Sequence, residues 1–261
     1  TIIMDKGSQS IEGYKDSTTV TRGTWLKLAN NVNGDMFYIN GTNTYESTSG
    51  FDYYRLSRLI LVGNKNYQTA GSGITVKQAG HVELEHIHLD AFKTFGLNIE
   101  SAQIVELTSV AAQYCGSRGL SISGLNYKSR VTSCWAFSNP ANIVIQSCQD
   151  ATFIDLKAYN STTNNGILIS ESKNLKFYGL DAQENWEHGV DFYGSHDISI
   201  FGGIIKNNGQ KNNNTYYGVR FRSAGAVPSG NNTLVGLEIY SDIAKIHGYS
   251  VVEEDANQDY N

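Results

Sequence analysis

Charged and aromatic residues gather between positions 186 and 222, and their side chains could bind or transform a polar ligand. If the ligand is a sugar, an arginine can neutralise a uronate or act on its acidic C5 proton, a carboxylate can hold calcium or serve as an acid, and an aromatic ring can stack on a sugar ring. The candidate catalytic residues are Asp191, Arg220, His188 and Glu187, and the candidate substrate-binding residues are Tyr193, Arg222, Trp186, Tyr216 and Tyr217. The alternative is an exposed Asp–Arg pair that only supports a sheet.

A second group of titratable residues lies in the stretch 81–90. His86, His88 and Asp90 alternate with apolar residues, so they share one strand face, where a His-x-His pair can bind a metal. The equivalent positions one repeat later are Ser109, Ala111 and Gln113, which are poor ligands. We therefore expect a solvated polar face and no metal here. No cofactor is required, and Ca²⁺ is the one ion that we keep as a candidate.

A repeat of about 23 residues must position all these side chains. Its rows begin at Gly73, Gly96, Gly119, Asn142, Gly166 and Gly189, in steps of 23, 23, 23, 24 and 23. A constant period of this size, with one apolar alternation led by glycine in most rows, indicates a solenoid in which each row is one coil.

Apolar residues recur in pairs at three places in each row. This pattern predicts three short strands per coil and three parallel sheets around one core. The strands of the first sheet are predicted near 74–77, 97–100, 120–123, 143–146, 167–170, 190–193 and 219–222.

The row that begins at Gly119 departs from the pattern, because Lys128 and Arg130 fall where apolar residues belong. A first turn shortened by one residue restores the alternation and brings four side chains inward, those of Tyr127, Ser129, Val131 and Trp135. In the turns, Asn160, Asn185 and Asn208 hold nearly equivalent row positions and are predicted to stack coil on coil.

Strand alternation also predicts which residues point outward from the first sheet. Asp191, Tyr193, Arg220 and Arg222 should form a two-by-two patch that the segment 186–188 enters from the preceding turn. The two longest rows place their extra residues at 207–217 and 223–232, on both sides of this patch. Insertions on a repeat scaffold often decorate the binding face, and the alternative is that both are tolerated surface insertions.

Composition narrows the classes of partner. The formal net charge of −5 and the pI near 5.7 leave no basic stripe for a phosphate backbone, so nucleic acid is a poor partner. The sequence contains no apolar run of 18 residues, so no transmembrane helix is predicted. The three cysteines lie at different points around neighbouring coils and are predicted to be small buried residues.

We expect a single domain over 1–261. It divides into irregular N-terminal coils and a cap at 1–72, regular coils at 73–206 and longer coils with loops at 207–261. The segment 248–251 matches the start of a further row, but the polar run 253–261 follows it. The C-terminal end is therefore predicted to be truncated or covered by a partner, either a second copy or a further chain, and the alternative is that the polar tail folds back over it.

These rows, with their glycine-led strands and polar turns at 171–174 and 194–197, resemble the right-handed parallel β-helix of the pectate-lyase-like superfamily over about residues 63–251. The resemblance implies an all-β solenoid, an extended polysaccharide as partner and a place outside the cell or on a cell or virion surface. The superfamily includes polysaccharide lyases, glycoside hydrolases, uronate epimerases, tailspikes, adhesins and non-catalytic members. No complete catalytic motif of these branches is present. Binding or cleavage of a polysaccharide over the first sheet, non-catalytic adhesion and a purely structural, end-to-end assembling solenoid all remain open.

Overall fold

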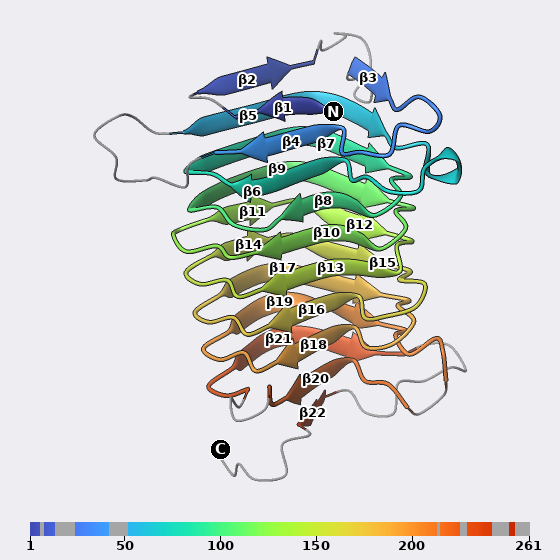
Figure 1. The fold of residues 1–261 in the computed structure, drawn as a ribbon. Coiled ribbons are helices and arrows are strands. Elements are labelled where there is room, and N and C mark those ends of the chain that lie inside the picture. Colours follow the sequence, from blue (N-terminus) through green and yellow to red (C-terminus); the bar gives the residue numbers. More distant parts are fainter. Residues whose placement is uncertain are drawn as a thin grey trace, which may run out of the picture.

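The chain winds into a stack of coils, each contributing to a first sheet and then to a second, as Figure 1 shows. The computed structural model describes residues 1–5, 8–13, 24–41, 52–212, 215–224, 229–241 and 251–253. Within these residues every strand pairing is parallel, and the one helical element is the single 3-10 turn η1 (Lys65–Tyr67).

The first sheet contains one strand from each coil, and neighbouring strands in space are one coil apart in sequence. In spatial order its described strands are β1 (Ile2–Met4), β4 (Phe37–Asn40), β6 (Ile74–Gln78), β8 (Phe95–Ile99), β10 (Arg118–Ser123), β13 (Ala141–Gln146), β16 (Ile167–Ser170), β18 (Val190–Tyr193), β20 (Val219–Arg222) and β22 (Val251–Glu253). The seven strands predicted for this sheet are all confirmed.

The second sheet is longer in each coil and bends in the middle. Its described strands are β2 (Gln9–Glu12), β3 (Thr24–Lys27), β5 (Tyr53–Val62), β7 (His81–Asp90), β9 (Ile104–Gln113), β11 (Arg130–Thr132), β12 (Trp135–Phe137), β14 (Thr152–Ile154), β15 (Lys157–Tyr159), β17 (Lys176–Gln183), β19 (Ser199–Lys206) and β21 (Thr233–Tyr240). At the bend each coil places one residue in the left-handed region: Arg58, His86, Ser109, Ser133, Asp155, Gly179, Gly202 or Gly236. The sequence predicts three separate sheets, whereas the structure has two in its described part: the first sheet, and a second sheet whose two arms make the other two faces of the coil.

Alternate side chains from the three faces fill one continuous core. Equivalent residues of successive coils lie on top of one another, and the rings of Phe153 and Phe177 stack with centroids 4.7 Å apart. Cys115, Cys134 and Cys148 are buried free thiols, which confirms their predicted packing role. Burial raises the thiol pKa to about 12 in Cys115 and Cys134 and to about 11 in Cys148.

The structure corrects the prediction for the row that begins at Gly119. Ser129 and Val131 point inward as predicted, but Tyr127 is 53% exposed and Trp135 faces outward beside the buried Cys134 and Ala136. The hydroxyl of Ser129 accepts the backbone N–H of Val105 and donates to the carbonyl of Tyr127. The turn is therefore closed by a buried serine, which leaves the Tyr127 ring outside.

The two ends differ from the prediction in their details. Residues of the N-terminal segment form strands of both sheets, with Met4 buried while Ile2 and Ile3 are exposed. At the other end Val251 pairs with Val219. The last row therefore begins two residues later than the predicted start at Gly248. The predictions for the covering of the C-terminal end fall on residues outside those described.

A ladder of buried asparagine side chains joins successive coils at the turns that lead from the second sheet back to the first. Asn185 donates from Nδ2 to the Ala158 carbonyl at 3.0 Å, and its Oδ1 accepts the backbone N–H of Ser161 at 3.0 Å. Asn208 repeats this pattern one coil later: its Oδ1 accepts from the backbone N–H of Asn185, and its Nδ2 donates to the Ala182 carbonyl. The predicted stacking of Asn185 and Asn208 is confirmed, whereas Asn160 occupies the left-handed corner before Ser161 and is not a rung.

Replacing Asn185 by alanine should lower the free energy of unfolding by about 3 kcal/mol, because the Ser161 N–H and the Ala158 carbonyl lose their partners inside the core. Urea unfolding measures this loss. The control is Asn126→Ala at an exposed turn position, which should stay within about 0.5 kcal/mol of the parent chain. Equal losses in the two variants would contradict a structural role for the ladder.

Candidate functional site

The predicted patch lies on the outer face of the first sheet, where β16, β18 and β20 pair in register. Asp191 stands opposite Leu168 on one side and Arg220 on the other, and Tyr193 stands opposite Arg222. This pairing confirms the predicted two-by-two arrangement. Parallel strands place equivalent residues about 4.8 Å apart, so the side chains of neighbouring coils meet directly.

Asp191 is the centre of the patch, although it is fully buried. Arg220 reaches it with two bonds, Nε to Oδ1 at 3.0 Å and Nη2 to Oδ2 at 2.7 Å. Arg222 adds a bond from Nη2 to Oδ2 at 3.0 Å. Asn165 donates from Nδ2 to Oδ2 at 2.9 Å. Asp191 lies on the outer face as predicted, but longer side chains cover it, so the alternative of an exposed Asp–Arg pair is wrong in its exposure.

The arginines decide the charge state of Asp191. Burial alone would raise the pKa of this carboxyl, but the hydrogen bonds and positive charges of Arg220 and Arg222 outweigh it, so the pKa is lowered from its ordinary value. Asp191 is therefore an anion at neutral pH. Two guanidinium groups and one carboxylate leave the trio with a net positive charge.

Of the trio Asp191, Arg220 and Arg222, only the two arginines are accessible to solvent. The side chain of Arg222 is 34% exposed and that of Arg220 19%, whereas Asp191 is 0% exposed. The Arg222 guanidinium also lies over the ring of Tyr193, with its Cζ 4.3 Å from the ring centroid. This contact and the bond to Asp191 hold Arg222 from two sides.

His188 lies beside the trio, but it is 2% exposed. Its ring stacks on Tyr217 with centroids 5.2 Å apart and meets Tyr216 edge-on at 5.2 Å. The Tyr217 backbone N–H donates to Nδ1 at 3.0 Å. The His188 pKa is lowered to about 3, mainly because the ring is buried and secondly because Arg220 is positively charged. The ring is therefore neutral and supports the edge of the site.

Glu187 and Trp186 extend the site toward solvent. Glu187 accepts from Lys211 Nζ at 3.2 Å, and the ammonium group also lies 5.6 Å from the Tyr216 ring centroid. The hydrogen bonds that the ammonium group donates to Tyr216 and to Glu187 raise the Lys211 pKa. Trp186 is 37% exposed and is held through its backbone N–H by Ser161.

The sequence prediction missed Asn165 and Lys211. Asn165 donates to Asp191, and its Oδ1 accepts the backbone N–H of His188 at 3.2 Å. Alternation does not find Asn165, because this residue lies three positions before the outward Leu168 and so has the opposite parity. Its place just before a row start, which it shares with His188 and Tyr217, is the signal that could have pointed to it. Lys211 belongs to the loop 207–217, whose described residues do border the site. Of the loop 223–232, residues 225–228 lie outside the described part.

The site offers little to a metal ion. Both oxygens of Asp191 already accept N–H donors, so Ca²⁺ would have to displace them. The cluster in β7 is occupied by ion pairs: Arg55 bonds Glu83 at 3.0 Å and Glu85 at 2.9 Å. Over the described residues, no group of three or more His, Cys, Asp or Glu side chains is placed to hold a metal.

Comparison with known proteins shows the fold. No family model matches the chain, and no curated protein matches its sequence. The enzymatically active domain of tailspike protein 2 from bacteriophage CBA120 matches 96% of this chain at 14% identity, with a TM-score of 0.56 over 47% of that chain. Full-length tailspike protein 2 matches with a TM-score of 0.57 at 15% identity, over 96% of this chain and 42% of that chain.

A third structure, ORF18 of Geobacillus virus E2, matches with a TM-score of 0.50 at 11% identity, over 96% of this chain and 52% of that one. This chain therefore spans about half the length of these proteins or less. At such low identity the likeness concerns the fold, which is the right-handed parallel β-helix that the sequence predicts. The described chain contains no helix long and apolar enough to cross a membrane.

Asp191→Asn should destabilise the fold by about 3 kcal/mol at neutral pH, because two arginines then share a buried group that carries no charge. The folded-state pKa of Asp191 is lowered, so its carboxylate contributes stability above the unfolded value of about 3.9 and loses it as the pH falls through the folded pKa. The gap between the two proteins should therefore be constant above about pH 5 and close in acid. Denaturant unfolding across pH measures it, with exposed Asp150→Asn as the control; a gap that does not depend on pH would contradict the assignment.

His188 should stay neutral with its proton on Nε2 from about pH 8 down to about pH 5, whereas an ordinary histidine titrates in that range. The reason is its burial against Tyr217, whose N–H occupies Nδ1. Nitrogen-15 NMR of the imidazole rings reads both the charge and the tautomer. A His188 ring that titrates near its ordinary pKa would show that the site is open to water.

Proposed function

We propose that this chain binds an acidic polysaccharide, with Arg220 and Arg222 as the anchors for its carboxylates. The observation that carries the proposal is the buried Asp191, which orients two arginines on one outward face and leaves them with net positive charge. Guanidinium groups pair with carboxylates through two parallel hydrogen bonds, and they do so best when their orientation is already fixed.

The surroundings of the arginines favour a sugar over a simple anion. Tyr193 and Tyr216 are half-buried aromatic groups beside the trio, and Trp186 is exposed next to them. Sugar sites combine aromatic faces with a small number of fixed polar groups. Lys211 and Glu187 add a further cation and an acceptor for hydroxyl groups.

Binding without turnover is the form of the proposal that the side chains support best. Glycoside hydrolysis requires a protonated carboxyl as the acid and a second carboxylate across the bond. Asp191 is buried and ionised, Glu187 is paired with Lys211, and His188 is buried and neutral. The alternative is a lyase-like enzyme in which an arginine or a tyrosine removes the acidic C5 proton of a uronate.

We infer that the chain acts at the surface of a virion or a cell, or outside it, where such polymers occur. The likeness to phage tailspike protein 2 supports this inference, although it rests on the fold alone. A purely structural solenoid is the remaining alternative, in which Asp191 and its two arginines would only support the sheet.

A uronate polymer should bind the chain, while the same polymer with its carboxyls reduced to alcohols should bind at least about tenfold more weakly. Calorimetry or glycan-array binding at low and high salt measures this. Arg222→Gln should lose most of the affinity, whereas Lys27→Gln, which makes the same charge change at an exposed position of β3 in the second sheet, should keep it. In parallel, ultraviolet absorbance reports lyase turnover and the release of reducing ends reports hydrolase turnover. If either is detected, the proposed function changes from binding to catalysis. Equal binding of both polymers, or of both variants, would overturn the proposal.

A further inference from the structure

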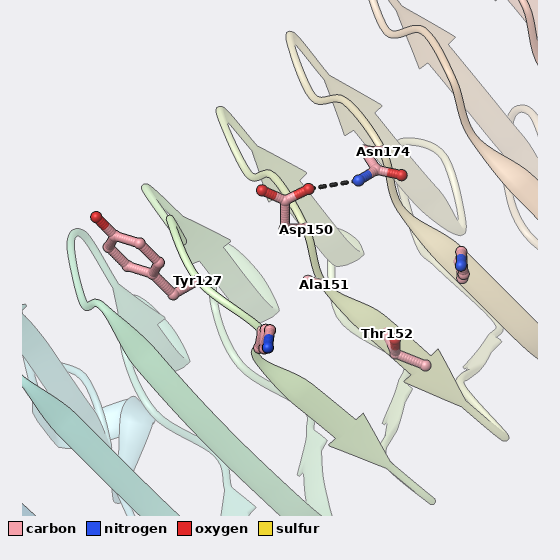
Figure 2. A pocket seen from close by; sticks show the side chains of 7 residues that line it. Tyr127, Asp150, Ala151, Thr152 and Asn174 are labelled. Carbon is pink, nitrogen blue, oxygen red and sulfur yellow. Dashed lines mark hydrogen bonds between the residues drawn. The ribbon is translucent and has the colours of Figure 1, made fainter.

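A separate cleft of about 320 Å³ lies on the outside of the turn that leads from the first sheet to the second. Figure 2 shows that its walls come from successive coils and that the Tyr127 ring projects at one end. The lining residues are Tyr127, Lys128, Asp150, Ala151, Thr152, Asn174 and Lys176. Such a volume lies at the small end of ligand pockets and suits a single sugar ring.

Strand register places these residues on a regular grid. Thr152 pairs with Arg130 on one side and Lys176 on the other, so a cation flanks the threonine on each neighbouring coil. Two positions earlier in the same coils stand Lys128, Asp150 and Asn174. Because coils are about 4.8 Å apart, the backbones of the two outer coils lie roughly 10 Å apart, and lysine side chains are long enough to approach one anionic group between them.

Some of the lining has a structural explanation. Asp150 and Asn174 both have positive φ, 55° and 51°, at equivalent corners, and Asn174 donates a hydrogen bond to Asp150. Aspartate and asparagine are the residues that tolerate this conformation best after glycine. The turn alone therefore accounts for these two.

The lysines have no such explanation. Lys128 and Lys176 are exposed, and neither forms an ion pair with any residue of the described part of the chain. Lys128 stands at the position that Asp150 and Asn174 hold in the next two coils, and the hydrogen bonds of Ser129 are what turn this segment outward. The cleft thus has two cations, one carboxylate, a hydroxyl, an amide and an aromatic ring.

We propose that this cleft is a second ligand site, which binds one acidic sugar residue with its carboxylate or sulfate at Lys128 and Lys176. The hydroxyl groups of the sugar meet Thr152, Asp150 and Asn174. A bare anion is a poorer ligand, because the Asp150 carboxylate repels it but accepts hydrogen bonds from hydroxyl groups. The proposal rests on the cleft and its charges and does not depend on the function proposed for the arginine patch.

The test is a titration of the isotope-labelled full chain with glucuronate, glucose 6-sulfate, glucose and inorganic phosphate, followed by NMR. We expect saturable shifts of the Thr152 and Asn174 amides with both acidic sugars, and binding about tenfold weaker for glucose and for phosphate. Lys176→Gln should weaken glucuronate binding about threefold to tenfold. Lys173→Gln removes the same charge from an exposed position outside the cleft and should have little effect.

The other outcomes each decide against the proposal. Equal binding of phosphate and glucuronate makes the cleft a simple anion site. If glucose binds as tightly as glucuronate, the lysines do not contribute to recognition. If Lys176→Gln and Lys173→Gln weaken glucuronate binding equally, the effect comes from the overall charge of the chain and not from the cleft. Arg222→Gln should leave these amide shifts unchanged, so a failure here is distinguishable from a failure at the arginine patch.

Discussion

The structure depends on how the backbone N–H groups at the corners of each coil find partners. A corner interrupts the sheet ladder, and an N–H group buried there without an acceptor costs free energy. In this chain the acceptor is a side chain of the next coil. Asn139 Oδ1 accepts the backbone N–H of Cys115 in this way. Along a different edge, Ser172 Oγ accepts the backbone N–H of Cys148, and Ser195 Oγ accepts that of Ser172. Each coil is thereby fixed in register to its neighbour, which is why the outward columns line up.

The amide ladder also explains a variation in the repeat. Rows usually begin with glycine, because a side chain there would collide with the ladder: a Cβ on Gly166 would lie 2.4 Å from Nδ2 of Asn185. One row begins with Asn142 instead, and the rung that follows it is the shorter Ser161. The Asn142 amide fills this space and bonds the Tyr159 carbonyl at 2.7 Å and Asn185 at 3.1 Å. In that coil the asparagine of the ladder stands at the start of the first-sheet strand, as Asn142, and not in the turn. The hydrogen-bonded ladder therefore continues through this coil.

Much of the fold is predictable from the sequence, because a period of about 23 residues and strand alternation fix both the solenoid and the first-sheet strands. The pairing of Asp191 with Arg220 follows from the same register. Alternation does not predict solvent exposure, however. Asp191 points outward yet is buried, because the arginines on the next strand fold over it. Tyr127 was assigned inward because its turn depends on the hydrogen bonds of Ser129, which periodicity alone does not reveal.

The buried Asp191 is better explained by organisation than by stability. Removing a carboxylate from water costs several kcal/mol, and an apolar residue at this position would support the sheet at least as well. The surrounding outward positions of the same column show this alternative, with Val144 and Leu168 on the two preceding coils. What the carboxylate adds is orientation: two long side chains lose their rotamer freedom during folding instead of during binding. Under the proposed function, a ligand carboxylate would meet guanidinium groups that are already in place, and the free energy lost in burying Asp191 would be offset by tighter binding.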